Sequence, residues 1–91
     1  MAKMIVNHKV EDFKNWKSVF DSMHSLRKQF GCTSERIFQS HSNPNEVLII
    51  TEWGTSEQAH KYGQSKELAE GMKKAGVVNK PEIYFSEEVT A

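Results

Sequence analysis

The chain has 91 residues, the size of one domain, because two domains sharing this length would each be too small to bury a core. Twelve Lys and Arg residues balance twelve Asp and Glu residues, and this formal net charge of +0 argues against nucleic-acid binders and membrane-surface binders, which carry a basic excess. A single cysteine, Cys32, excludes an internal disulfide and any metal site built from several cysteines.

The amino-terminal third predicts a strand followed by a long helix. MAKMIVNHKV has no long apolar core, and no run approaches the ~18 apolar residues of a membrane span, so we expect a cytoplasmic protein without a signal peptide. Residues 4–10 mix apolar and polar side chains as a strand does. Asp12 is a good N-cap for a helix that runs to Phe30 and ends at Gly31. At about 100° per residue, Phe13, Trp16, Val19, Phe20, Met23, Leu26 and Phe30 fall on one face of that helix.

The middle of the chain predicts a β-hairpin. Residues 33–40 form its first strand, with Ile37 and Phe38 at the centre. The segment 41–45, HSNPN, is dense in turn-forming residues, and residues 46–53, EVLIITEW, are rich in β-branched and aromatic side chains. So short a connection joins antiparallel strands.

The last third predicts a second helical region and a final strand. Thr55-Ser56-Glu57-Gln58 resembles a capping box, which begins a helix. Gly63 and Ser65 are expected to interrupt that helix, and Gly76 to end it. Pro81 precedes a strand over residues 82–89.

The resulting order, β-α-β-β-α-β, predicts an α+β, ferredoxin-like domain over residues 1–91, with a four-stranded antiparallel sheet covered by helices on one face. When one face of a sheet is exposed to solvent, apolar and polar residues alternate along each strand. Runs such as 47–50 and 83–85 instead place apolar side chains on both faces. A second copy of the sheet would cover the exposed face, so we expect a homodimer.

Short motifs spread along nearly the whole chain resemble those of one known protein family. Their residues are Asn7-His8-Lys9-Val10, Asp12, Phe13, Trp16, Phe20, Arg27, Gly31, Glu52-Trp53, Ala59, Ser65, Leu68, Met72, Ala75-Gly76-Val77 and Pro81. At these positions the chain resembles the antibiotic-biosynthesis-monooxygenase-like family of the dimeric α+β barrel superfamily.

The resemblance implies two subunits joined sheet to sheet, each with a pocket between its helices and its sheet. Members of the group range from cofactor-independent oxygenases acting on polycyclic phenols to haem-degrading enzymes, isomerases and proteins without a known activity. Asn7 stands where some haem-degrading members carry a functional asparagine, and Tyr62 stands at the place of their helical tryptophan. Met72 occupies the approximate position of their haem-ligating histidine; a thioether is a weaker anchor, so we expect neither haem nor another cofactor.

Arg27 is the most informative candidate residue, because it falls inside the apolar stripe between Trp16 and Phe20. An unpaired buried charge is costly, so the guanidinium needs partners. It would form a structural ion pair, with Glu52 as one candidate. Otherwise the aliphatic part of the side chain would pack against apolar residues while the guanidinium reaches solvent. Alternatively, it would clamp an anion or enolate in a pocket.

His8 lies mid-strand between apolar neighbours and is either a core histidine or a general base. Trp16, Phe20, Trp53, Tyr62 and Phe85 would line an aromatic pocket, or simply form the core. His24, His41 and His60 lack the short spacing of metal ligands, so we expect no metal site.

Two hypotheses about function stay open. In the first, the protein is a cofactor-independent monooxygenase-like, or cyclase- or isomerase-like, enzyme acting on an aromatic or polyketide-like compound, with His8 as base and Arg27 stabilising the oxyanion. In the second, it is a non-catalytic or stress-associated dimer that binds a small apolar molecule. Asn7 and Glu52 complete the predicted set of ligand-binding residues with the five aromatic side chains.

Overall fold

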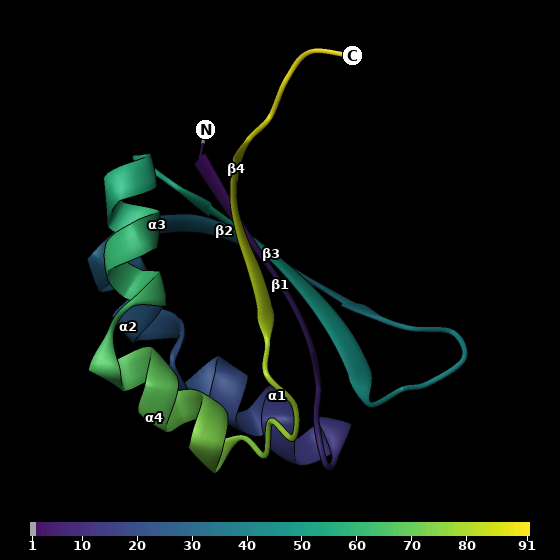
Figure 1. Cartoon of the computed structure of the whole chain (residues 1–91). Helices are drawn as coiled ribbons and strands as arrows, with labels where there is room; N and C mark the ends of the chain where they lie inside the picture. Colours follow the sequence, from purple (N-terminus) through teal and green to yellow (C-terminus); the bar gives the residue numbers. More distant parts are fainter. Residues whose placement is uncertain (1) are drawn as a thin grey trace.

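In the computed structural model, which describes residues 2–91, a four-stranded antiparallel sheet is covered on one face by four short helices (Figure 1). The elements in chain order are β1 (Ala2–Lys9), α1 (Phe13–Ser22), α2 (His24–Phe30), β2 (Cys32–Gln39), β3 (Glu46–Trp53), α3 (Ser56–Gly63), α4 (Lys66–Lys74) and β4 (Glu82–Glu87). The strand order β2-β3-β1-β4 confirms the predicted ferredoxin-like α+β topology. None of the described helices combines the length and the apolar composition needed to cross a bilayer.

The prediction of one continuous helix between residues 12 and 30 is wrong, because the helical geometry is interrupted at Met23 (φ −96°, ψ 3°) and the region forms two helices, α1 and α2. The Ser22 hydroxyl donates to the Val19 carbonyl at 2.6 Å, and the Met23 N–H donates to the Phe20 carbonyl at 3.1 Å. Both bonds reach back three residues, which tightens the turn and ends α1. No glycine or proline marks this break in the sequence.

The start of α1 also differs from the prediction. Asp12 occupies the N-cap position, but its side chain makes no capping hydrogen bond. The side-chain oxygen of Asn45, from the turn between β2 and β3, accepts instead from the Phe13 N–H at 3.0 Å. At the far end, Gly31 ends α2 in the left-handed region (φ 109°), as predicted.

The predicted features of the second helical region are confirmed. Thr55 and Gln58 form a capping box, in which the Gln58 N–H donates to the Thr55 hydroxyl at 3.1 Å and the Thr55 N–H donates to the Gln58 side chain at 3.0 Å. The region divides after Gly63, and the Ser65 hydroxyl caps α4 by accepting from the Leu68 N–H at 3.0 Å.

The Gln58 side chain joins three element ends. It lies over Gly31 and Gly54, and a Cβ atom at Gly54 would come within 2.7 Å of its oxygen. The Gly54 N–H donates to the Gly31 carbonyl at 3.2 Å, so the end of α2, the end of β3 and the start of α3 meet at this point.

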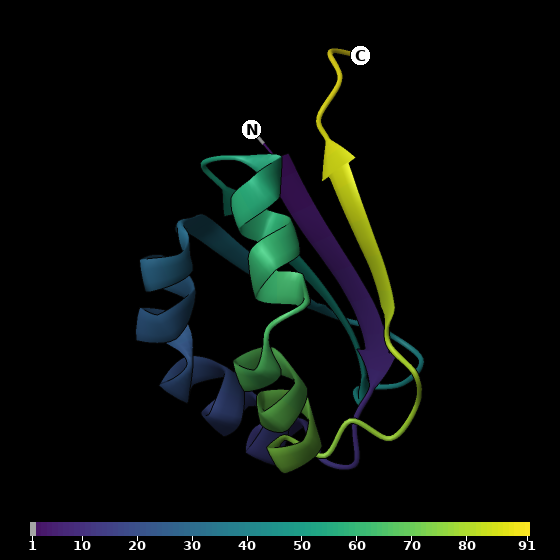
Figure 2. The same cartoon turned by 60° about the vertical axis from the view of Figure 1, so that its left-hand side comes forward.

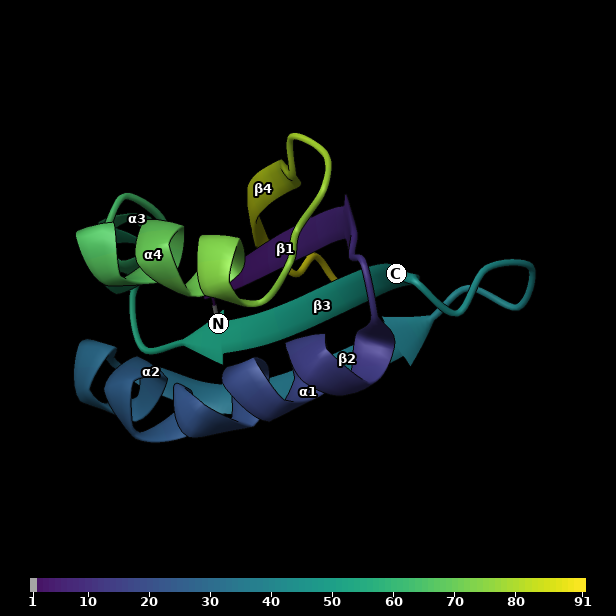
Figure 3. The same cartoon turned by 90° about the horizontal axis from the view of Figure 1, so that it is seen from below.

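The helices lie in two rows, α1–α2 and α3–α4, against the same face of the sheet (Figures 2 and 3). On β1 and β3, every second residue points toward the helices and is buried: Ala2, Met4, Val6 and His8, and Val47, Ile49, Thr51 and Trp53. The alternate positions form the open face of the sheet, where the apolar residues are Ile5, Phe38, Leu48, Ile50 and Tyr84. Apolar side chains therefore occupy both faces, as the sequence predicts.

Candidate functional site

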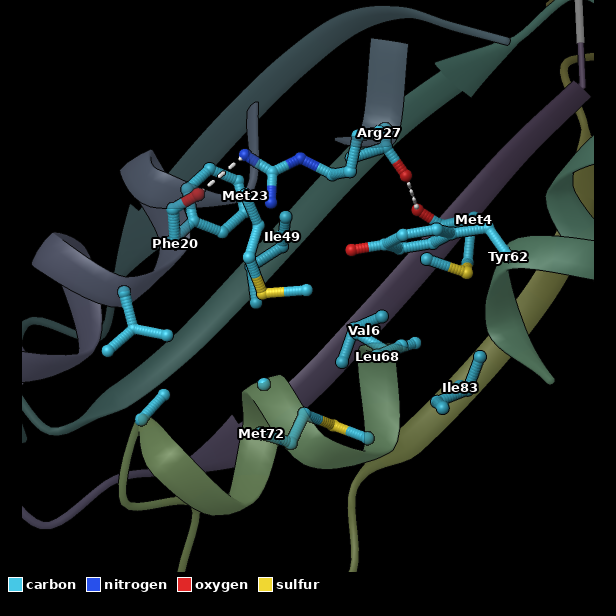
Figure 4. A pocket seen from close by; sticks show the side chains of 14 residues that line it. Met4, Val6, Phe20, Met23, Arg27, Ile49, Tyr62, Leu68, Met72 and Ile83 are labelled. Carbon is cyan, nitrogen blue, oxygen red and sulfur yellow. Dashed lines mark hydrogen bonds between the residues drawn. The ribbon is translucent and has the colours of Figure 1, made fainter. Parts of the chain in front are cut away.

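A cavity of about 60 Å³ lies between the two rows of helices and the sheet, lined by 14 residues (Figure 4). Met4 and Val6 of β1 and Ile49 of β3 contribute from the sheet, while Met23 and Met72 contribute from opposite rows of helices. The polar side chains in the lining are those of Arg27, Thr51 and Tyr62. The cavity is thus an apolar space with a small polar region.

Arg27 forms part of the cavity wall and is only 3% exposed, which confirms its predicted place in the apolar stripe of the helix. Its Nε donates to the carboxylate of Glu35 on β2, and its Nη2 donates to the Phe20 carbonyl at 2.8 Å. The guanidinium carbon also lies 3.7 Å from the centre of the Phe20 ring, close enough for a cation–π contact. The buried charge therefore has an ion-pair partner, a carbonyl and an aromatic face.

Glu52, the candidate partner of Arg27 in the sequence, does not pair with it; that prediction is wrong. Glu52 pairs across the sheet with Ser34 and lies on the open face, where its carboxylate is 3.3 Å from Lys3 Nζ. Glu35 pairs with Thr51 and faces the helices. The register of β2 shifts between Cys32 and Ser34, and such a bulge hides from the sequence which β2 residues point inward.

Glu35 links the cavity wall to the protein surface. Its second carboxylate oxygen lies 2.7 Å from Nδ1 of His24, whose side chain is 60% exposed. Burial alone would raise the pKa of Glu35, but the hydrogen bonds from Arg27 and His24 outweigh it and hold that pKa below its usual value. Glu35 is therefore ionised at neutral pH, and neither it nor His24 was singled out as a site residue from the sequence.

Tyr62 contributes the other polar head group near Arg27. Its ring is buried, and its hydroxyl points into the cavity toward the side on which the guanidinium lies (Figure 4). Burial raises the pKa of this phenol, and the positive charge of Arg27 opposes that rise. The ring packs against Trp53 with centroids 5.1 Å apart, so Trp53 supports the cavity wall from behind rather than lining it.

His8 is buried on the helix-facing side of β1, but it does not line the cavity. Its ring meets Trp16 edge-on at 5.7 Å, and its buried Nδ1 has no hydrogen-bond partner among residues 2–91. Burial lowers the pKa of His8, and a backbone hydrogen bond only partly opposes this. The structure therefore places the predicted base outside the cavity whose wall contains Arg27.

The predicted ligand-binding residues separate into four groups. Phe20 and Tyr62 line the cavity, whereas Trp16 and Trp53 are buried behind its lining. Asn7 faces the open side of the sheet, as Glu52 does.

Phe85 forms a fourth group, because it lies on the helix-facing side of the sheet, opposite Met4, but outside the cavity lining. It lies on β4 with its ring stacked on that of His60, centroids 4.0 Å apart. Of the five aromatic residues predicted to line a pocket or form the core, Phe20 and Tyr62 therefore line the cavity, and the other three lie on the same side of the sheet outside its lining.

The described part of the chain holds no group of three or more His, Cys, Asp or Glu side chains placed to bind a metal ion. Cys32 is half-buried, and its thiol donates to the Ser34 carbonyl at 3.4 Å. Burial raises the pKa of this thiol, which keeps it protonated and weakly nucleophilic.

Comparison with known proteins gives a family and a set of similar folds. The family model described as antibiotic biosynthesis monooxygenase matches residues 6–74. No curated protein sequence matches the chain. A solved structure from Bordetella bronchiseptica, classed with the antibiotic biosynthesis monooxygenases, superposes with a TM-score of 0.80 at 16% identity, covering 98% of this chain and 97% of that one.

Two further structures have the same fold. A conserved protein from Methanosarcina mazei superposes with a TM-score of 0.76 at 15% identity, over 97% of this chain and 92% of its own. SnoaB, a cofactor-independent oxygenase from Streptomyces nogalater, gives a TM-score of 0.74 at 10% identity, over 97% of this chain and 94% of its own. At these identities the likeness concerns the fold alone.

Proposed function

Because the chain belongs to the antibiotic biosynthesis monooxygenase family, we propose that its cavity binds a small apolar or aromatic molecule and that two copies associate through their open sheet faces. The observation that carries the proposal is the composition of the cavity wall. Apolar side chains surround the space, and the Arg27 guanidinium and the Tyr62 hydroxyl lie together at one side. Such a site suits a ligand with an apolar body and one polar oxygen.

As an enzyme, the protein would act on an electron-rich aromatic or polyketide-like compound without a cofactor. Arg27 would stabilise negative charge that develops on the oxygen of the deprotonated substrate, in a space from which apolar walls exclude water. The base stays a prediction. His8 would need to approach the cavity in order to take the proton, since Trp16 packs against its ring.

A second candidate function is binding without catalysis, and one observation favours it. Arg27 is already paired with Glu35 and the Phe20 carbonyl, and the lining side chains described include no carboxylate, histidine or lysine to act as a base. In this case Arg27 is a structural residue of a ligand-binding dimer, for which we propose a cytoplasmic location.

The proposed dimer is supported by the open face of the sheet. Phe38 and Tyr84 are 42% and 51% exposed there, beside Ile5, Leu48 and Ile50. Contiguous apolar surface of this kind marks an interaction site, and a second sheet of the same kind matches it in shape and character.

The test pairs stability with binding for Arg27→Leu. We would measure the unfolding midpoint and the affinity for 4-fluorophenol in wild type and variant, and oxygen consumption with a panel of electron-rich phenols. If Arg27 holds the ligand, the variant loses affinity for 4-fluorophenol but keeps its affinity for fluorobenzene, which lacks the oxygen.

If Arg27 is structural, unfolding shifts to lower temperature and the two affinities change together. Oxygen consumption by the wild type supports the enzyme, whereas binding without turnover supports the second function. If neither aromatic compound binds to the wild type, the proposed site is wrong.

A further inference from the structure

The size of the cavity limits what it accepts, and this inference rests on the proposed function. An apolar cavity of roughly 150 Å³ holds one benzene molecule. The cavity between the helices and the sheet measures about 60 Å³. An aromatic ring therefore fits inside this space only if a side chain of the wall moves.

One part of the wall separates the cavity from a second space at the surface. A groove of about 240 Å³ lies between the α1–α2 row and α4. Val19, Met23 and Gly71 line both the cavity and this groove. At these three residues the cavity and the groove share their lining, so they are separated here by a layer formed by the side chains of Val19 and Met23.

The Met23 side chain fills this layer because residue 71 has no side chain. A Cβ atom at position 71 would overlap the Met23 sulfur and lie 2.7 Å from its terminal methyl group. Gly71 lies inside α4, where glycine costs stability relative to alanine, and it is not among the positive-φ glycines of the described chain. The glycine is therefore explained by the space that the thioether needs.

We propose that Met23 is the gate of the cavity, and that Met23 and Gly71 together determine the width of the ligand that enters. Methionine is unbranched and rotates about three bonds, so its thioether can leave the notch above Gly71 without a change in the backbone. Rotation of this one side chain joins the cavity to the groove, and the combined space then accommodates an aromatic ring. Met72 lines the cavity from α4 but does not border the groove.

The experiment compares two variants with the same chemical change, Met23→Ala and Met72→Ala. Each removes the same atoms from the same cavity, but only the first removes the layer next to the groove. Xenon, an apolar probe small enough to report on the cavity without an aromatic ring, is followed by ¹²⁹Xe NMR. The association rate constant of 4-fluorophenol is obtained from ¹⁹F NMR exchange, with thermal unfolding recorded for every variant.

We expect Met23→Ala to raise the association rate constant about tenfold or more, and Met72→Ala to leave it within about threefold of wild type. Gly71→Ala provides a second variant that replaces glycine by a better helix former and displaces the thioether from its notch. Its association rate constant should differ from that of wild type by about tenfold in either direction.

Each alternative result has a distinct meaning. If 4-fluorophenol does not bind to the wild type, the proposed function fails, whether or not xenon enters the cavity. If 4-fluorophenol binds to the wild type and its association rate is unchanged in Met23→Ala and Gly71→Ala, or is raised equally by Met72→Ala, the cavity binds ligands but Met23 is not its gate.

Discussion

Glu35 determines whether the charge of Arg27 is tolerated inside the protein. Arg27 is 3% exposed, so loss of the carboxylate would leave a buried guanidinium without an anionic partner, facing the Phe20 carbonyl and ring. Glu35→Gln should therefore lower the free energy of unfolding by about 3 kcal/mol at neutral pH. Urea denaturation at pH 7 measures this loss.

Asp21→Asn is the matched control, because Asp21 forms an exposed ion pair with Lys17 on α1 at 2.7 Å. It should cost less than about 1 kcal/mol. The stability that Glu35 supplies is present above the pKa of an unfolded glutamate and is lost as the pH falls toward its lowered folded pKa. Equal losses for the two variants at pH 7 would contradict the role given to Glu35.

His8 should make the stability of the protein fall at acidic pH. Its pKa is lowered by burial in the folded state, so above about pH 6.5 both states are neutral at this residue. Below that pH the unfolded chain takes up a proton that the folded protein disfavours, and stability falls by up to about 1.4 kcal/mol per pH unit.

His8→Leu removes this proton uptake and keeps an apolar neighbour for Trp16. The stability of the variant should decline less than that of wild type between pH 6.5 and 5, measured by urea titrations at half-unit intervals. Parallel declines would show that His8 does not contribute to the acid sensitivity.

At the residue scale, the sequence predicted that Arg27 would be buried, because helical periodicity places it between Trp16 and Phe20. It did not predict Glu35 or His24, since the bulge in β2 changes which side chains point inward. Nor did it predict that His8 and Arg27 would be separated, because this depends on how α1 packs over β1.

At the scale of the elements, two helix N-caps that look equivalent in the sequence differ in their hydrogen bonds. Asp12 and Thr55 both occupy N-cap positions, but only the Thr55 side chain accepts a backbone hydrogen bond. Thr55→Ala should cost about 1 kcal/mol of stability, whereas Asp12→Ala should cost no more than the few tenths that its charge contributes near a helix start. Thermal or urea unfolding of the two variants tests this, and a larger loss for Asp12→Ala would contradict the assignment.

Element order and most element ends followed from the sequence because local signals determine them: Gly31, the Thr55 capping box, and the Gly63–Ser65 break. The interruption at Met23 was missed because its cause is a hydroxyl-to-carbonyl bond within an otherwise helical pattern. The Asn45 cap on α1 was missed because the two residues that form it are 32 positions apart.

For the whole molecule, the open face of the sheet predicts association. Light scattering at micromolar concentration should give about twice the chain mass of 10.4 kDa. Ile50 lies near the middle of this face on β3, so Ile50→Lys would bury two unpaired charges in the dimer and should shift the mass to that of a monomer. Lys14→Glu, on the exposed side of α1, is the control and should remain dimeric. A wild-type monomer would contradict the proposed dimer.

The junction held by Gln58 has a consequence for how this sequence can diverge. Gly54 has no positive φ, so among the described residues the Gln58 side chain is what an alanine there would displace, whereas Gly31 is also restricted by its left-handed backbone. Gly54→Ala and a shortening of Gln58 are therefore not independent events. Alanine at position 54 displaces the Gln58 amide, so a chain that makes this change first gives up the Gln58 half of its capping box, at a cost of about 1 kcal/mol. In a chain that has already shortened Gln58, the same alanine no longer meets that side chain, so the cost of each mutation depends on the order in which the two occur.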